Sequence, residues 1–261
     1  MKIAISGKGG VGKTTLTALL AHHYASEGRP VLAIDADPSP CLGEALGFPE
    51  AQLRRLRPIA EMKDLIAERT GATGGQAAGA FFKLNPRVDD LPERFSEVHD
   101  GIRLLLLGAV EQGGSGCICP ASTLVKQLVK HLLLERDGVV LLDLYAGVEH
   151  LGRGTAEAVD MMIAVAEPTQ RSMGTVRQIK ALAADIGVHR LMLVGNKASD
   201  EADRQFFKQH APDIPLIGVL EATEKALIAD RTGQVLYRLE PKLAAQASAF
   251  AREIETASQL E

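Results

Sequence analysis

The amino-acid sequence predicts an α/β fold in which a mostly parallel sheet is flanked by helices on both faces. Short apolar runs alternate with helical patterns along most of the 261 residues. Strands that are buried on both faces are almost continuously apolar, and their alternation with helices is typical of a parallel sheet. A glycine-rich turn between the first strand and the first helix is the third observation, because it is the phosphate-binding signature of one such fold, the P-loop NTPase fold.

The first strand is expected over residues 2–6, and the first helix over residues 14–27. Between them lies the run Gly-Lys-Gly-Gly-Val-Gly-Lys-Thr-Thr at residues 7–15, which matches the phosphate loop GxxxxGK(S/T). Its glycines let backbone N–H groups curl around phosphates at a helix start, with Lys13 on the terminal phosphates and Thr14 on Mg²⁺. The alternative is a glycine-rich turn that binds no ligand. The strand before this run and the helix after it favour the phosphate loop over that alternative. The residues expected to contact the nucleotide are Gly9, Gly10, Val11, Gly12, Lys13, Thr14 and Thr15.

A second apolar strand, over residues 31–34, ends at Asp35-Ala36-Asp37-Pro38. Open α/β sheets bind their ligands beyond the carboxyl ends of the strands, so both carboxylates are expected near the phosphate loop. A carboxylate at that place orders the Mg²⁺ shell or positions the attacking water. The alternative is a pair of solvated turn residues.

The pattern loosens between residues 38 and 100, where we expect one helical segment over residues 59–69 and a small-residue loop at 71–76. The strands on either side are expected in the same sheet. The sequence therefore predicts a single domain over residues 1–261 with an insertion at about residues 47–100. Insertions of this kind usually carry contacts to partners or effectors.

Two cysteines, Cys117 and Cys119, lie in a glycine-rich turn between a strand at residues 102–107 and a helix at 122–135. A helix start lowers the pKa of nearby thiols and favours metal binding or redox chemistry. A closed thiolate site takes four ligands, so the pair predicts a metal that bridges a symmetric dimer. The alternative is two compact buried side chains. Cys41 has no cysteine nearby in sequence and is interpreted as structural.

An apolar strand at residues 138–143 ends in Asp143, which is predicted to support Mg²⁺ through its water shell. The glycine-punctuated residues 145–154 suit a switch segment that reports the terminal phosphate. His150 lies within this segment and is interpreted as a hydrogen-bonding group rather than a metal ligand.

The remaining chain alternates regularly, with strands at 161–166, 190–195 and 214–219 and helices at 173–186, 201–210, 223–230 and 241–255. Asn196 and Lys197 follow a strand at the ligand edge and are predicted to contact the nucleotide. The amide of Asn196 has the donor and acceptor that a purine edge needs, although a turn or cap role is equally open. Ser199 stands where guanine specificity usually brings an aspartate, which favours ATP.

The charge and the apolar runs of the chain indicate which classes of partner to expect. The chain has 29 basic and 33 acidic residues, a formal charge of −4, without the basic excess that nucleic acid or an anionic membrane attracts. No apolar run approaches the ~20 residues that span a bilayer, and no leader precedes the first strand. We therefore expect a cytoplasmic protein with neither nucleic acid nor membrane as a partner. Three cysteines, an odd number, leave free thiols.

Several of these motifs carry a family resemblance. The phosphate loop with Lys8 and the turn at residues 35–38 resemble the deviant phosphate-loop ATPases, the branch of the septum-positioning, arsenite-pump and nitrogenase iron proteins. Within it, the sequence is similar to the carbon monoxide dehydrogenase maturation ATPases, the nickel-insertion accessory proteins of the CooC type. The specific matches are Cys-Ile-Cys-Pro at 117–120 and Glu-His-Leu-Gly-Arg-Gly-Thr at 149–155.

The resemblance implies an ATP-driven homodimer that cycles between ATP and ADP with Mg²⁺. Lys8 would reach the partner's nucleotide and act with Lys13 and Asp37 in catalysis, where Asp37 positions water and Asp35 has a magnesium-shell or structural role. Cys117 and Cys119 of both subunits would bind Ni²⁺, or Zn²⁺ in its place. The client would be carbon monoxide dehydrogenase.

Two positions depart from the family, because Tyr145 stands where an acidic residue commonly follows the strand-end aspartate and Cys41 where the branch often has Asn. Two other functions compete. One is a metal-free, nucleotide-switched positioning ATPase, but residues 251–261 are acidic and lack the basic stripe that such proteins carry. The other is a reductase with a cluster bridging the dimer, whose cysteines are single and well separated, whereas these are paired.

Overall fold

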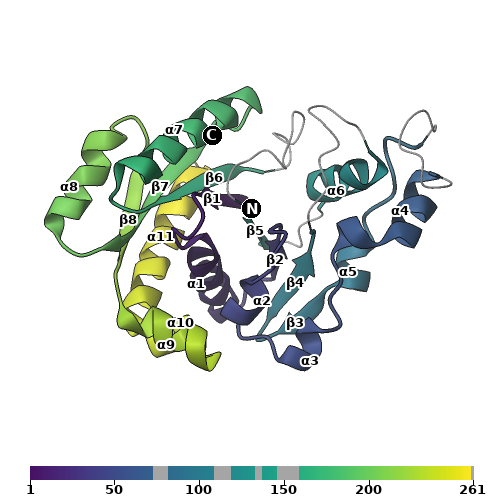
Figure 1. Ribbon diagram of the computed structural model, residues 1–261, viewed down its shortest axis with the longest axis horizontal. Helices are drawn as coiled ribbons and strands as arrows, with labels where there is room; N and C mark the ends of the chain where they lie inside the picture. Colours follow the sequence, from purple (N-terminus) through teal and green to yellow (C-terminus); the bar gives the residue numbers. More distant parts are fainter. Residues whose placement is uncertain (73–81, 109–118, 133–136, 146–158, 260–261) are drawn as a thin grey trace.

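The computed structural model describes residues 1–72, 82–108, 119–132, 137–145 and 159–259. Within them, eight strands form one sheet in the order β3-β4-β2-β5-β1-β6-β7-β8, and helices cover both of its faces (Figure 1). Neighbouring strands pair in parallel, except for the antiparallel pair β3–β4 at one edge. The predicted fold class is confirmed.

The strands are β1 (Lys2–Gly7), β2 (Val31–Asp35), β3 (Glu97–His99), β4 (Ile102–Leu106), β5 (Val139–Asp143), β6 (Met161–Ala166), β7 (Leu191–Ala198) and β8 (Leu216–Glu221). The helices are α1 (Lys13–Ser26), α2 (Leu42–Ala45), α3 (Glu50–Leu53), the 3₁₀ turn η1 (Ile59–Glu61), α4 (Lys63–Thr70), α5 (Leu91–Phe95), α6 (Pro120–Lys130), α7 (Gln170–Asp185), α8 (Glu201–His210), α9 (Glu224–Thr232), α10 (Leu236–Leu239) and α11 (Pro241–Gln259).

Alternation along the buried strands divides the core into two layers. In β1, Ala4 faces the layer that includes side chains of α4, α6, α7 and α8, whereas Ile3 and Ile5 face the layer built with α1 and α11. The same alternation runs through β2, β5 and β6, because successive strand residues point to opposite faces. This double burial explains why the central strands are apolar without interruption.

The C-terminal helix α11 lies along α1 (Figure 1). Its apolar residues, among them Leu243, Phe250 and Ile254, are buried in the core layer of α1. Arg29, just beyond α1, forms an ion pair of 2.5 Å with Glu255 and stacks its guanidinium over Tyr24. The apolar face of α11 is therefore used within the fold.

The insertion contains several short elements. Residues 59–69 were predicted as one helix, but the structure has η1 and α4 separated by Met62, whose ψ of 77° is not helical. Arg69 of α4 holds the carboxylate of Asp90 at 2.9 and 2.7 Å, which fixes α4 against the start of α5. The strands β2 and β4 on either side pair directly. The assignment of the whole chain to a single domain stays a prediction.

Some boundaries differ from the predicted ones. The strand expected at residues 214–219 begins at Leu216, because Pro215 has no N–H to give to a ladder and contributes only its carbonyl oxygen, 2.8 Å from Leu193 N. The edge strand β3 has three residues, too few for a periodic pattern to show in sequence.

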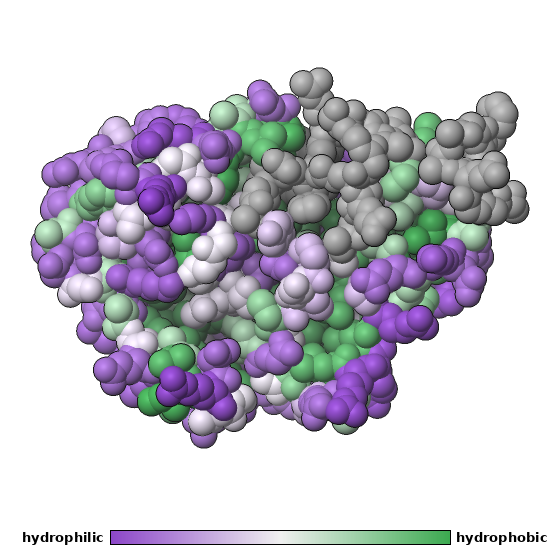
Figure 2. All heavy atoms as spheres, viewed as in Figure 1, coloured by the Kyte–Doolittle hydropathy of each residue, from purple (hydrophilic) through white to green (hydrophobic). Residues whose placement is uncertain are grey.

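The surface on the side of α8 is mostly hydrophilic (Figure 2). In the described ranges, no helix combines the length and the apolar character needed to cross a membrane.

Candidate functional site

The sequence-predicted site residues converge at the carboxyl ends of the central strands. β5 lies between β1 and β2, and Asp143 is the register partner of both Ile5 and Asp35. The phosphate loop leaves β1 two residues after Ile5. The structure therefore brings the loop and the two strand-end carboxylates to the same sheet edge, where open α/β sheets bind ligands.

The phosphate loop passes through Gly10 and Gly12, whose φ angles of 80° and 97° lie in the left-handed region. Helix α1 begins directly at Lys13, so its first backbone N–H groups point at the loop's concave side. The Lys13 side chain is 8% exposed, and its Nζ lies 3.4 Å from the carbonyl oxygen of Lys8. A buried ammonium beside free helix N–H groups is the arrangement that binds phosphates.

Asn196 and Lys197, at the end of β7, brace this loop from the side. The Asn196 amide donates to the carbonyl oxygen of Val11 at 2.7 Å and accepts from the Lys197 N–H at 2.8 Å. The Lys197 Nζ donates to Gly10 O at 2.7 Å and pairs with Glu167 at 2.6 Å. This bracing role and the part of Glu167 were missed by the sequence analysis. Recognition of the base by Asn196 stays a prediction.

We expect Gly12→Ala to destabilise the ligand-free protein by about 1–3 kcal/mol. A Cβ on Gly12 would lie 2.0 Å from the Asn196 Nδ2, and its φ of 97° is unfavourable for a residue with a side chain. Gly9→Ala is the matched control, because nothing lies within 4 Å of its added Cβ. Chemical denaturation measures both variants. Equal stability of the two would contradict the close contact between the loop and Asn196.

Asp35 is fully buried and organises the turn that follows β2. Its carboxylate accepts backbone N–H groups of Asp37 at 3.0 Å and of Cys41 and Leu42 at 2.9 Å each. Burial raises the pKa of Asp35, against the effect of these three hydrogen bonds. These contacts give Asp35 a structural role, and its share in the Mg²⁺ shell stays a prediction. Asp37 is half-buried, and its Oδ1 accepts a hydrogen bond of 2.8 Å from the Ser39 N–H.

Asp143 is 2% exposed and accepts a hydrogen bond of 2.6 Å from the Thr14 hydroxyl. Its second oxygen, Oδ1, has no hydrogen-bond partner among the described residues. Burial raises the pKa of Asp143 to about 7. A buried carboxylate oxygen left without a partner beside the phosphate-loop threonine fits a hydrated Mg²⁺, which takes oxygen ligands and keeps several waters.

Cys41 lies beside Thr14, the residue that donates to Asp143. Its Sγ is 3.7 Å from the Thr14 Oγ1, and the residue is exposed. Partial burial and the nearby carboxylates of Asp35, Asp143 and Asp37 raise the pKa of its thiol. The interpretation of Cys41 as a structural residue stays a prediction.

Cys119 is the N-cap of α6, and its Sγ accepts a hydrogen bond of 3.3 Å from the Ser122 N–H. Cys117 lies outside the described residues, as do His150 and the rest of residues 146–154 of the predicted switch segment. Across the ranges that are described, no three His, Cys, Asp or Glu side chains gather as a metal site. The paired-thiol metal site therefore stays a prediction. Tyr145, which follows β5, is 46% exposed.

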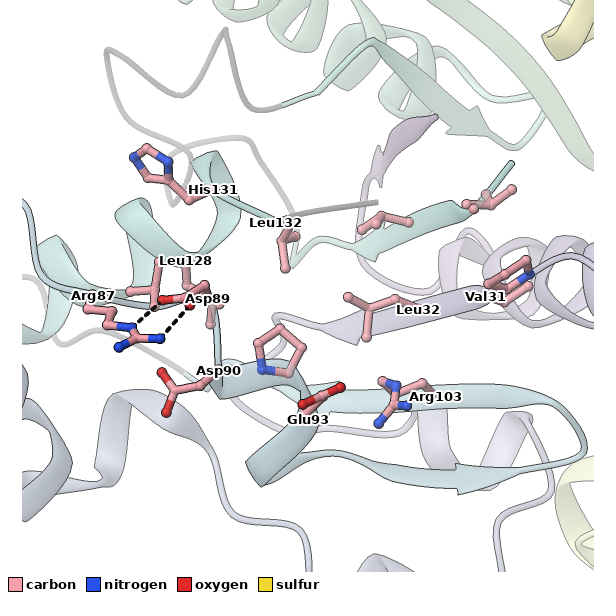
Figure 3. Close-up of a pocket in the computed structure, with 16 residues that line it drawn as sticks. Val31, Leu32, Arg87, Asp89, Asp90, Glu93, Arg103, Leu128, His131 and Leu132 are labelled. Carbon is pink, nitrogen blue, oxygen red and sulfur yellow. Dashed lines mark hydrogen bonds and ion pairs between the residues drawn. The ribbon is translucent and has the colours of Figure 1, made fainter. Parts of the chain in front are cut away.

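Among the cavities lined by the described residues, two are large enough to consider as ligand sites. One, of about 670 Å³, opens beside Thr14, Thr15 and Cys41 and continues between α1 and α9–α10. The other, of about 510 Å³, lies at the opposite edge, where β2 and β5 begin. Figure 3 shows its wall of Leu128 and Leu132 and the ion pair of Arg87 with Asp89. The second cavity contains none of the predicted site residues.

Comparison with known proteins shows the family of the chain. The family profile of the CobQ/CobB/MinD/ParA nucleotide binding domain matches residues 2–237. The chain is 46% identical to the carbon monoxide dehydrogenase accessory protein CooC of Rhodospirillum rubrum over 92% of this chain and 91% of that protein. It is 45% identical to an uncharacterized ATP-binding protein of Methanocaldococcus jannaschii over 80% and 79% of the two chains. The resemblance inferred from the motifs is confirmed.

Solved structures support the fold. The MinD cell division protein of Aquifex aeolicus is similar with a TM-score of 0.66 and 20% identity, over 98% of this chain and 97% of that one. A putative plasmid partition protein of Borrelia burgdorferi, bound to AMPPNP, has a TM-score of 0.67 and 13% identity over 98% of both chains. At these identities the likeness establishes the P-loop NTPase fold alone.

Proposed function

We propose that this chain, which belongs to the CobQ/CobB/MinD/ParA family of nucleotide-binding domains, is an ATP-driven metallochaperone that supports nickel insertion into carbon monoxide dehydrogenase. The chain is an ATPase. The role in nickel insertion is supported by the 46% identity to a carbon monoxide dehydrogenase accessory protein across 92% of the chain. The Cys-x-Cys pair at residues 117–119 supports it as well.

The nucleotide half of the proposal rests on the described site. Backbone N–H groups of residues 9–15 and the Lys13 ammonium would hold the phosphates. Thr14 and Asp143, already joined at 2.6 Å, would hold Mg²⁺ and its water shell, and the bound ion would neutralise charge on the phosphates. Asp37 is exposed enough to meet a water at this edge and is the proposed water-positioning residue. Asn196 and Lys197 hold the loop in shape.

The metal half rests on Cys117 and Cys119. Cys119 lies at the start of α6, where its Sγ accepts a hydrogen bond of 3.3 Å from the Ser122 N–H. One chain supplies only two of the four thiolates that close a tetrahedral site. We therefore propose a homodimer in which both pairs bind one nickel as cargo, with zinc able to take its place. The Lys8 side chain, exposed on the loop, would reach the partner's nucleotide and make the dimer sensitive to ATP.

The competing function is a metal-free positioning ATPase like the septum-site and partition proteins. Positioning proteins of that kind use a basic amphipathic C-terminal helix or surface. Here the apolar residues of α11 are buried against α1 and β8, which leaves that face unavailable. This observation favours the chaperone.

Nickel binding by the Cys117→Ser, Cys119→Ser double variant tests the metal half. The unaltered protein is expected to bind about one nickel per dimer with thiolate-to-nickel absorption, and the double variant to lose both. The third cysteine supplies the matched control, because Cys41→Ser is expected to retain the tight site of one nickel per dimer. Unchanged nickel binding in the double variant would refute the metal assignment.

A further inference from the structure

We propose that Cys41 is a ligand for thiophilic divalent cations at the nucleotide site, where it joins Thr14 and Asp143. The inference builds on the Mg²⁺ site proposed above and concerns which cations that site accepts. Mg²⁺ takes oxygen ligands and does not bind a thiol, whereas Zn²⁺, Cd²⁺ and Co²⁺ bind thiolates well.

The separation of Thr14 and Cys41 fits one ion bound by both side chains, beside the carboxylate of Asp143. The Thr14 hydroxyl lies 2.6 Å from the Asp143 Oδ2 and 3.7 Å from the Cys41 Sγ. Metal–sulfur and metal–oxygen bonds of about 2.3 and 2.1 Å separate the two ligand atoms by roughly 3.5–3.8 Å at near-tetrahedral angles. The observed separation of Thr14 and Cys41 lies within that range.

Asp143, already proposed as part of the Mg²⁺ site, has a free oxygen for a cation at this place. Its side chain is 2% exposed, and its Oδ1 has no partner in the described part of the chain. A buried carboxylate oxygen is seldom left in this state unless it meets a cation or a water. Asp143 is held against the Thr14 hydroxyl by its other oxygen, so Oδ1 lies at the same cluster.

The position of Cys41 is fixed from both sides. Its N–H donates to the buried Asp35 at 2.9 Å, and the next residue begins α2, which packs on α1. The thiol is exposed and borders the 670 Å³ cavity that reaches Thr14 and Thr15. An ion from solution therefore has access, and phosphate oxygens or waters would complete its coordination.

Cadmium is a suitable probe because a thiolate–cadmium bond adds a charge-transfer band in the ultraviolet. In the Cys117→Ser, Cys119→Ser variant, Cys41 is the remaining cysteine of three. We expect this variant to bind one Cd²⁺ per chain with thiolate absorption. Adding Cys41→Ser should abolish the absorption, and adding Asp143→Asn should weaken binding by at least about tenfold. No thiolate absorption, or absorption that survives Cys41→Ser, overturns the inference.

A second measurement uses the unaltered protein, in case the double variant does not fold. N-ethylmaleimide labelling of each cysteine is followed by peptide mass spectrometry, with and without Cd²⁺. We expect Cd²⁺ to slow labelling of Cys41 at least tenfold, and the same concentration of Mg²⁺ to slow it less. Protection of Cys117 and Cys119 without protection of Cys41 overturns this inference and supports the proposed thiolate pair. Protection of Cys41 alone supports this inference and counts against the proposed thiolate pair.

Discussion

Lys13→Ala is expected to lower ATP turnover by at least about 100-fold, the usual cost of removing a group that stabilises charge in the transition state. Phosphoryl transfer depends almost entirely on positioning and on charge neutralisation at the phosphates. Lys13 opens α1 at the loop with an ammonium that is 8% exposed, and the neighbouring carboxylate of Asp143 lies close enough to feel its charge. Phosphate release at saturating Mg²⁺ and ATP measures the effect.

The control for Lys13→Ala is Lys208→Ala, which removes an exposed lysine on α8 far along the chain from the loop. It should turn over ATP like the unaltered protein. Thermal unfolding of both variants separates loss of the group from loss of the fold. Turnover of the Lys13 variant within a few-fold of the unaltered protein would mean that the loop does not act as a phosphate loop.

Lys8→Ala is expected to lose turnover to a similar degree while keeping ATP binding within a few-fold. Only the carbonyl of Lys8 is used by its own loop, where it contacts Lys13. The ammonium of Lys8 makes no hydrogen bond or ion pair with the residues that the structure describes. The side chain is exposed and free to act on the nucleotide of a second subunit, as the family resemblance implies.

Mixing the two variants tests action across the dimer. A heterodimer of Lys8→Ala and Lys13→Ala subunits has one complete site, made from the Lys13 of one subunit and the Lys8 of the other. Random mixing at equal amounts makes half of the dimers mixed, so we expect recovery of about a quarter of normal turnover. A mixture as inactive as its components, or a Lys8 variant with normal turnover, would contradict a role for Lys8 in the partner's site.

Much of the fold was accessible from the sequence, because central strands buried on both faces have an unmistakable apolar pattern. The runs that become β1, β2, β5 and β6 are examples. The short elements were not accessible, since four residues, as in α2 or α10, hold barely one helical turn. Packing rather than local pattern decides such elements.

Some features of the site were also predictable from the sequence, and others were not. A strand-end position is visible in sequence, so the places of Asp35 and Asp143 followed from the sheet alone. The hydrogen bond from Asn196 to Val11 joins residues 185 positions apart, and the approach of Cys41 to Thr14 depends on a turn closed by the buried carboxylate of Asp35. Contacts of this kind need the folded chain, because no local pattern encodes them.

We propose that the nucleotide cycle controls a metal shared by two subunits. Native mass spectrometry of the nickel-loaded protein, with ADP or with a non-hydrolysable ATP analogue, measures subunit number and bound nickel together. We expect a dimer with one nickel per two chains, whose nickel occupancy differs between the two nucleotide states and is lost with Cys117→Ser and Cys119→Ser. A monomer that holds its own nickel, or a dimer with the same nickel occupancy in both states, would contradict it.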